Sequence, residues 1–422
     1  MGNFFIIGYG KIGKQIDKLL KFYNPITFDL QSDEAHLHDL GSLSICIANL
    51  SDRRFTVLIC LPDNAVTRVI ENLMSIFKKN DSVTILDFSN AYYKDSEYRA
   101  DYLNARGFTY LSVPISGGVD LANNSAIFLS GNESVSENIK TTLEKLTQNR
   151  AEGVIFCGTV PNSSLVKSIH NCFEYCECWV ISEIYATLSS EKKSLEKKFF
   201  LALSEINQSS YLSDLLLDLA AQEPIKNRKD TTLTVPSNGS VLSFLKFAND
   251  HNLPCLLFAS ALNARTPLIE KFSPEYPDQT KRFLTEEDFP LFFEALSFVR
   301  RVAFLELVCG INLILSGDKR LISELVKCFA SRCIIRGSFL HTQSVEFDRH
   351  KDTESYLENE LSYLMAQLQQ IENAKGISPI EDMLVSFKAA SLSLKLNSNL
   401  QSRFALHYLR YRFGGHNELN VF

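Results

Sequence analysis

Short apolar runs alternate with amphipathic helical patterns along the first part of the chain, from Asn3 to about Gly158. The apolar runs are FFIIGYG, ITFDL, FTVLICLP, VTILDFS and FTYLSVP, and the helical pattern IGKQIDKLLKFY follows the first of them. Strands that alternate with helices predict a mostly parallel sheet with helices on both faces. We therefore expect an α/β domain over residues 1–158.

After this region strand-type runs become rare and long helical patterns replace them. The clearest helical patterns span Ser163 to Leu188, Leu284 to Leu315 and Thr353 to Glu372. They predict a large all-helical domain over residues 159–398. The last stretch, residues 399–422, mixes aromatic and basic side chains and is expected to form a short C-terminal tail with a role of its own.

Composition narrows the class of protein. A chain of 422 residues with 45% hydrophobic and 22% charged residues is long enough for two or three globular domains. The net charge of −6 and the absence of a basic stripe argue against a nucleic-acid partner. No apolar run approaches the roughly 18 residues of a membrane span, and the N-terminus lacks a signal-peptide pattern, so a cytoplasmic protein without a membrane partner is expected.

The 10 cysteines fit the same compartment, because most stand singly in apolar runs as reduced thiols do. Cys172, Cys176 and Cys178 are close in sequence, but no second CxxC or HxxxH pair accompanies them. A zinc site usually needs such a pair, so no metal is expected.

A glycine motif marks a candidate cofactor site. Ile6 and Ile7 end a predicted strand that runs into G-x-G-x-x-G, which consists of Gly8, Gly10 and Gly13 with Lys11 and Ile12 between the last two. Such a turn lets backbone approach a pyrophosphate at a helix N-terminus. Asp29 ends the next strand and fits a ribose-binding acid that would repel a 2′-phosphate, which favours NAD over NADP. The alternative is a glycine-rich turn that binds no ligand.

A row of polar side chains marks a candidate catalytic helix. Lys167, His170, Asn171, Glu174 and Tyr175 fall at i, i+3, i+4, i+7 and i+8 of a helical pattern, which places them on one stripe. A solvated face explains lysine and glutamate equally well, because such residues often pair on exposed helices. Histidine, asparagine and tyrosine in the same row are more typical of a polar cleft.

Two further segments end strands at the edge where α/β sheets bind ligands. LDFSN ends in Asn90, and VPISGG supplies Ser116, Gly117 and Gly118. Consecutive N–H groups in a Ser-Gly-Gly turn can hold a carboxylate. Each segment taken alone is better explained as a structural turn.

Together these segments resemble the 6-phosphogluconate dehydrogenase family, within the β-hydroxyacid dehydrogenases. The similar segments, in chain order, are the Gly8–Gly13 motif, DFSNAYYKDSEYR (family DGGNSEYRDT), ISGG, VKSIHNCFEY (family VKMVHNGIEY), LNAR (family FAR), CIIRGSFL (family CIIR) and the RFGGH tail (family R-x-x-F-G-x-H). The resemblance implies a Rossmann domain, a large helical domain and a tail that reaches into the partner subunit of a homodimer.

The resemblance also implies roles for individual residues. Lys167 would be the general base for oxidation at C3 of a sugar acid, and Glu174 the acid that protonates the enediol left when CO₂ departs. The carboxylate and hydroxyls of the substrate would be held by Asn90, Ser116, Gly117, Gly118, His170 and Asn171. Its phosphate end would meet Tyr175, Arg265 and, from the other subunit, Arg410 and His416.

One departure from the family concerns the substrate. Where the family has KGTGKW, this chain has PSNGSVL over Pro236–Leu242, so a phosphate-binding lysine and threonine are missing. Two alternatives to decarboxylation of 6-phosphogluconate therefore stay open. One is a β-hydroxyacid dehydrogenase that stops at the ketone of another sugar acid, and the other is a cofactor-binding homologue without activity.

Overall fold

The computed structural model describes residues 2–116, 125–147, 153–189, 193–207, 239–265, 285–333 and 337–373, with isolated positions from 213 to 221 and at 335. The chain packs into two compact units. The first unit comprises Met1–Ser168, Leu242–Phe244 and Ile314–Ile334, and the second comprises Ile169–Val241, Leu245–Leu313 and Ile335–Phe422. The finer division into 1–158, 159–398 and 399–422 stays a prediction.

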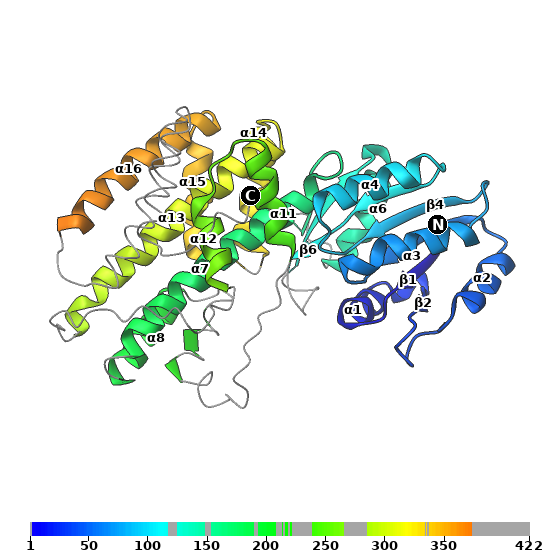
Figure 1. The fold of residues 1–422 in the computed structure, drawn as a ribbon, viewed down its shortest axis with the longest axis horizontal. Helices are drawn as coiled ribbons and strands as arrows, with labels where there is room; N and C mark the ends of the chain where they lie inside the picture. The colour runs from blue at the N-terminus through cyan, green and yellow to red at the C-terminus, as the bar shows by residue number, and fades with distance from the viewer. Residues whose placement is uncertain are drawn as a thin grey trace. The chain divides into compact units, whose positions relative to one another are not determined.

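The first unit is built on one sheet, seen in Figure 1 in blue and cyan. Its strands are β1 (Asn3–Ile7), β2 (Ile26–Phe28), β3 (Arg54–Ile59), β4 (Ser82–Asp87), β5 (Thr109–Ser112), β6 (Ile115–Ser116), β7 (Ala126–Gly131) and β8 (Val154–Phe156). The first five are parallel and lie in the order β2-β1-β3-β4-β5. The strand order reverses beside β1, and such a reversal is where doubly wound sheets bind ligands at the carboxyl ends of their strands.

Helices cover both faces of this sheet because alternate residues of each strand face opposite sides. They are α1 (Lys11–Leu19), α2 (Leu40–Asn49), α3 (Asp63–Ile76), α4 (Tyr93–Asn104) and α6 (Glu133–Leu146). Phe5, Val57 and Ile85 pack with apolar residues of α2, α3 and α4, whereas Ile6 and Leu58 pack with α1 and α6. The predicted parallel α/β domain is confirmed.

The antiparallel strand β7 was not anticipated. It pairs antiparallel with both β5 and β6, and parallel with β8. The predicted strands up to FTYLSVP are present, with β5 ending at Ser112.

The rest of the described chain is helical, as the sequence predicts. The helices are α7 (Asn162–Ser189), α8 (Lys193–Ile206), α11 (Gly239–Asp250), α12 (Leu256–Arg265), α13 (Phe289–Ile314), α14 (Lys319–Ser331), α15 (Ser338–Arg349) and α16 (Thr353–Asn373). The predicted start at Leu284 was early, because a short 3₁₀ turn, Glu286–Asp288, precedes α13.

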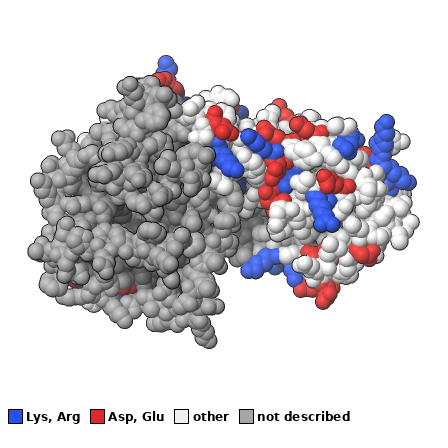
Figure 2. Space-filling model, in the orientation of Figure 1, with Lys and Arg blue, Asp and Glu red and all other residues white. Residues whose placement is uncertain are grey.

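Two further features concern the charge of the surface and the length and apolar character of the helices. Figure 2 shows basic and acidic side chains interspersed on the described part of the face in view, without a patch of one sign. In the part of the chain that the structure describes, none of the helices combines the length and the apolar character needed to span a bilayer.

Candidate active site

The turn after β1 depends on two glycines that a larger residue could not replace without movement. Gly8 has a φ of +96°, and a Cβ there would lie 2.6 Å from the carbonyl oxygen of Cys60. A Cβ on Gly13 would lie 2.0 Å from the carbonyl oxygen of Gly8. The first turns of α1 therefore pack directly against the end of β1, as a dinucleotide-binding turn requires.

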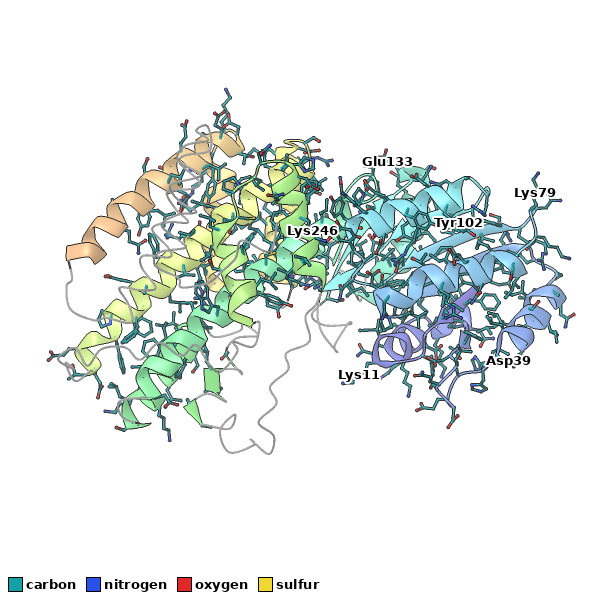
Figure 3. The ribbon with its side chains drawn as sticks, viewed as in Figure 1. Lys11, Asp39, Lys79, Tyr102, Glu133 and Lys246 are labelled. Carbon is teal, nitrogen blue, oxygen red and sulfur yellow. The ribbon has the colours of Figure 1, made fainter. Side chains whose placement is uncertain are left out.

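Gly10 has a different environment. A Cβ at Gly10 would meet no atom within 4 Å, and Gly10 is the N-cap of α1 with no side chain capping the helix. A helix N-terminus beside open space binds anions through its backbone N–H groups and its partial positive charge. This turn thus fits the pyrophosphate of a dinucleotide. Lys11, the first residue of α1, is exposed on the outside of the domain (Figure 3), and Ile12 is half-buried.

Asp29 lies directly after β2 and is held against the glycine turn. One carboxylate oxygen accepts a hydrogen bond from the backbone N–H of Tyr9 at 2.6 Å, and the other accepts from Gln31 at 2.7 Å and Ser32 at 3.1 Å. Burial raises the pKa of Asp29, but the three N–H donors outweigh it and lower the pKa below its ordinary value. The residue is therefore a fixed, ionised carboxylate at neutral pH.

Two contacts around this loop were not foreseen from the sequence. The Tyr9 hydroxyl donates to Asp17 of α1 at 2.6 Å, and this bond raises the pKa of Tyr9 to about 12. Lys14 of α1 pairs with Glu34, which lies in the loop after β2. The charge of Lys14 is thus partly neutralised by an acid of the loop that follows β2.

Asn90 lies beyond the carboxyl end of the parallel strand β4, whereas Ser116 lies within strand β6. Asn90 follows β4 by three residues and is exposed, whereas Ser116 ends β6 and is buried. Ser116 pairs with Ala126 of β7, so it belongs to an antiparallel ladder rather than to the end of a parallel strand. Gly117 and Gly118 lie outside the described residues.

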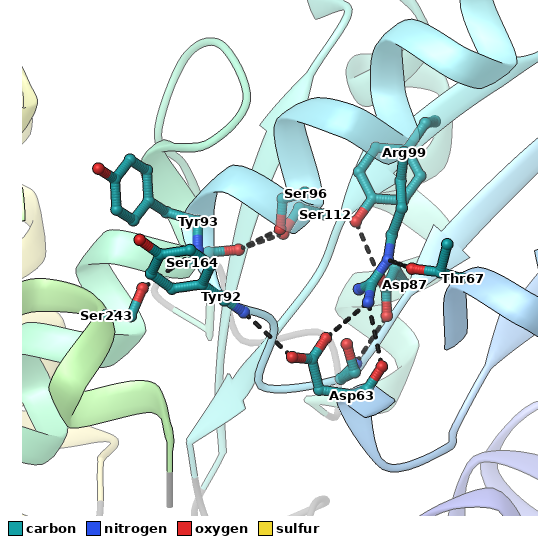
Figure 4. Close-up of polar contacts among 12 residues, drawn as sticks. Asp63, Thr67, Asp87, Tyr92, Tyr93, Ser96, Arg99, Ser112, Ser164 and Ser243 are labelled. Atoms are coloured by element: carbon teal, nitrogen blue, oxygen red, sulfur yellow. Dashed lines mark hydrogen bonds and ion pairs between the residues drawn. The ribbon is translucent and has the colours of Figure 1, made fainter. Parts of the chain in front are cut away.

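A buried arginine that was not predicted from the sequence lies between two acids (Figure 4). The guanidinium of Arg99 in α4 pairs with Asp63 at 2.7 Å and with Asp87 at 3.0 Å, and its Nε donates to Thr67 at 3.0 Å. The Tyr110 hydroxyl donates to Asp87 at 2.8 Å. Burial opposes a charge on Arg99, but the acids raise its pKa well above the ordinary value. A charged residue within the buried stripe of α4 was the available signal.

A cluster of buried serines attaches the first turn of α7 to the carboxyl end of β5. Ser164 shares hydrogen bonds with Ser112 at 3.0 Å and with Ser96 of α4 at 2.9 Å. Ser163 donates to the Ser112 carbonyl at 3.1 Å and shares a hydrogen bond with Ser130 of β7 at 2.7 Å. The helix therefore starts at the carboxyl end of β5.

The polar stripe predicted on α7 is present, but it does not lie on a solvated face. Lys167 is 8% exposed, Asn171 5% and Tyr175 4%, and His170 has no exposed surface. The ring Nδ1 of His170 lies 3.1 Å from the Asn171 side-chain oxygen. Glu174 is half-buried. The alternative reading, a row of solvent-facing residues, was wrong.

A buried ion pair lies beyond the polar stripe along α7, and it was not predicted from the sequence. Glu177 of α7 pairs with Arg300 of α13 at 2.7 Å, and Arg300 donates to the Asn207 side chain at 3.3 Å. Burial raises the pKa of Glu177, Arg300 lowers it and Glu174 raises it, with a net rise. The signal was a charged residue between Cys176 and Val180, which are both buried.

Several predicted residues cannot be placed. Arg410 and His416 lie outside the described residues, and so does the side chain of Arg265 at the end of α12. Among the described residues no group of three ligand-type side chains comes together to hold a metal. Cys172 is buried, and burial raises its pKa well above the ordinary value.

Comparison with known proteins shows which proteins this chain is similar to. Residues 27–158 match the NAD binding domain of 6-phosphogluconate dehydrogenase. The decarboxylating 6-phosphogluconate dehydrogenase of Bacillus licheniformis is 25% identical over 342 residues, which are 74% of this chain and 70% of that protein. The chain is a distant relative of the decarboxylating 6-phosphogluconate dehydrogenases. The family and fold predicted from the sequence are confirmed.

The 6-phosphogluconate dehydrogenases to which this chain is similar differ in cofactor. The NAD⁺-dependent decarboxylating enzyme of Bacillus subtilis is 23% identical, with 74% of this chain and 70% of that protein covered. The Plasmodium falciparum 6-phosphogluconate dehydrogenase, solved with NADP⁺ and with 6-phosphogluconate, has 19% identity and a TM-score of 0.71 over 98% of this chain and 97% of its own. That structural likeness shows a shared fold.

Proposed function

We propose that this protein oxidises and decarboxylates 6-phosphogluconate or a closely related 3-hydroxy sugar acid, with NAD as the cofactor. One observation carries the proposal. The first turn of α7 is hydrogen-bonded to Ser112 at the carboxyl end of β5, and a buried lysine, Lys167, follows one turn later. A lysine is rarely buried in a protein, because its charge is costly to desolvate.

Lys167 is proposed as the general base. It would remove the proton of the C3 hydroxyl as the hydride leaves C3, and the nicotinamide of bound NAD supplies the acceptor for that hydride. A lysine base must be neutral when it acts, and burial favours the neutral amine over the ammonium ion. The 8% exposure of Lys167 supports this role.

Glu174 is proposed as the acid in the second half of the reaction. Oxidation at C3 places a carbonyl β to the carboxylate, and the electron pair of the C–CO₂ bond can then move towards that carbonyl. The resulting enediol needs one proton at the carbon that lost CO₂. Glu174 stands two helical turns after Lys167 on the same stripe and keeps access to solvent, from which it can be reprotonated.

The remaining predicted residues would bind the substrate. Its carboxylate and hydroxyls would be held by Asn90, Ser116, Gly117, Gly118, His170 and Asn171. Its phosphate end would meet Tyr175 and Arg265, with Arg410 and His416 supplied by the tail of a partner subunit in a homodimer. Buried polar side chains, such as those of His170 and Asn171, are typical of substrate-binding sites.

The preference for NAD rests on charge at the ribose end of the cofactor site. The Asp29 carboxylate is fixed beside the glycine turn, and a 2′-phosphate there would meet a negative charge. Lys14 lies near but is paired with Glu34. An NADP-binding turn would need an unpaired cation in this loop.

A second candidate function is favoured by the segment Pro236–Leu242. It lacks the lysine and threonine of the family's KGTGKW, so a substrate without phosphate, oxidised by the same Lys167 and not decarboxylated, is the alternative. A homologue that binds cofactor without turnover is the third possibility.

A panel of sugar acids with and without phosphate separates these functions. Turnover would be followed as NADH, NADPH and released CO₂, with Lys167→Ala as the control that removes the base. We expect NADH and CO₂ in equal amounts from a phosphorylated acid and none from the variant. Ketone without CO₂ would favour the second candidate, and cofactor binding without any turnover would favour the third.

A further inference from the structure

Arg99 is buried between two acids at the carboxyl end of β4 (Figure 4). Arg99 and Asp87 are each 1% exposed, and Asp63 lies at the first residue of α3. The two carboxylates repel each other unless a cation lies between them, and a buried charge is tolerated only when it is paired and hydrogen-bonded. The position of each acid therefore depends on Arg99.

The same acids hold the backbone on both sides of Asn90. The carboxylate oxygen of Asp87 that does not face Arg99 accepts from the N–H of Ser89 at 2.9 Å. The corresponding oxygen of Asp63 accepts from the N–H of Tyr92 at 3.3 Å. Asn90 is exposed between these two attachment points. Its flanks are thus fixed while its side chain is presented outward.

The other contacts of this cluster do not reach the Asn90 segment. Thr67 in α3 accepts from the Nε of Arg99, and Tyr110 in β5 donates to Asp87. Both contacts hold the cluster of Arg99 and its two acids without involving residues 88–92. Thr67 therefore offers a matched control, since its loss removes one bond of Arg99 and leaves both attachment points in place.

We propose that Arg99 is a positioning residue that, through Asp63 and Asp87, fixes residues 88–92 so that the Asn90 amide is held in place for the substrate. The inference rests on the proposed function, in which Asn90 binds the sugar acid. Arg99 itself is buried and need not touch substrate. Its effect should be seen in how well substrate is oriented, more than in how tightly the dinucleotide binds.

The test is Asp63→Asn in the full-length protein. Asparagine keeps the size of the side chain and an oxygen for Arg99, but its NH₂ group opposes the N–H of Tyr92. We expect kcat/KM for the sugar acid to fall about tenfold, chiefly through KM, which is about 1.4 kcal/mol. The Kd for NADH should change less than threefold, because the glycine turn and Asp29 bind that ligand. Thr67→Val should stay within twofold of wild type in both quantities.

Hydrogen exchange measured on the peptide that covers residues 88–93 tests the same inference without turnover. We expect faster exchange in Asp63→Asn than in Thr67→Val or wild type. Arg99→Lys, which keeps the charge but loses the planar fork that bridges two carboxylates, is the second variant if Asp63→Asn does not fold. Its exchange and kinetics should change as those of Asp63→Asn do.

The failures of the two ideas are distinguishable. If wild type oxidises no sugar acid, the proposed function fails, and exchange alone then decides whether Arg99 fixes residues 88–92. If wild type is active but Asp63→Asn keeps its kcat/KM within twofold, or Thr67→Val loses as much, the positioning role is overturned. Unchanged exchange in both Asp63→Asn and Arg99→Lys also overturns it.

Discussion

Gly10→Ala and Gly13→Ala should have different effects, although the G-x-G-x-x-G motif has glycine at both positions. At Gly13 a Cβ would lie 2.0 Å from the Gly8 carbonyl oxygen, whereas at Gly10 it would meet nothing within 4 Å. An ordinary contact between carbon and a carbonyl oxygen is about 3.3 Å or longer. Gly13→Ala must therefore move α1 away from β1 by about 1.3 Å, and Gly10→Ala need move nothing.

The expected magnitudes follow from these contacts. Overpacking of this kind costs about 1–3 kcal/mol, so Gly13→Ala should lower the free energy of unfolding by that amount. Gly10 has a φ of −78°, which alanine adopts without strain, so the stability of Gly10→Ala should change by about 1 kcal/mol or less. A methyl group at Gly10 would instead occupy space that the pyrophosphate needs. The loss of one charge-assisted hydrogen bond there, about 1.5–3 kcal/mol, weakens NADH binding at least about tenfold.

Urea denaturation and NADH fluorescence titration measure the two effects on the same samples. Gly10→Ala should keep the wild-type denaturation midpoint and lose NADH affinity, and Gly13→Ala should lose both. If Gly10→Ala binds NADH like wild type, the cofactor does not approach the backbone at this turn and the assignment of the site is refuted.

Three further outcomes are expected. Asp29→Ala should weaken NAD binding more than NADP binding, and a wild type that already prefers NADP would contradict the specificity argument. Removal of the residues after Asn399 should raise the KM for the sugar acid and leave NADH binding unchanged; unaltered kinetics would exclude a tail that completes the substrate site. Asp81 is buried and paired with Arg53 at 2.7 Å, and although burial raises its pKa, Arg53 and a backbone N–H lower it overall. The pair therefore stabilises the fold above the unfolded-state pKa of about 3.9 and loses that effect as the pH falls through the lower folded-state pKa. Asp81→Asn should cost about 1.5–3 kcal/mol in urea denaturation at pH 7. The gap to wild type should close as the pH falls below 4, and a gap that persists at low pH would assign the stabilisation to another cause.

The sequence predicts those parts of the fold and site that depend on local pattern. Short apolar runs predict the parallel strands, and G-x-G-x-x-G predicts the tight turn between β1 and α1, because each feature lies within a short stretch of chain. The contacts missed join distant residues. Arg99 meets Asp63 across 36 positions, and Ser163 meets Ser130 across 33. No spacing rule links such pairs, since folding alone brings them together.

Strand β7 was missed for a related reason. Its sequence, AIFLSG, is an apolar run like those of the parallel strands, and pattern alone does not give a strand its direction. The direction of a strand depends on the course of the chain that precedes it. Here β6 and β7 run antiparallel, so that Ser116 faces Ala126.

Helix α7 carries buried polar side chains, which the periodicity of its sequence does not reveal. Its apolar residues Leu165 and Ile169 are buried, and so are its polar residues Lys167 and His170. Both the apolar and the polar face of the helix are therefore buried. A helix enclosed in this way is usually apolar all round. Polar side chains kept there at a cost to stability are typical of residues retained for function. Lys167→Met should therefore abolish turnover while the variant still folds and binds NADH, measured by urea denaturation and NADH fluorescence titration. If Lys167→Met does not fold or no longer binds NADH, the amine is a structural requirement of the fold, and its burial no longer supports a catalytic role.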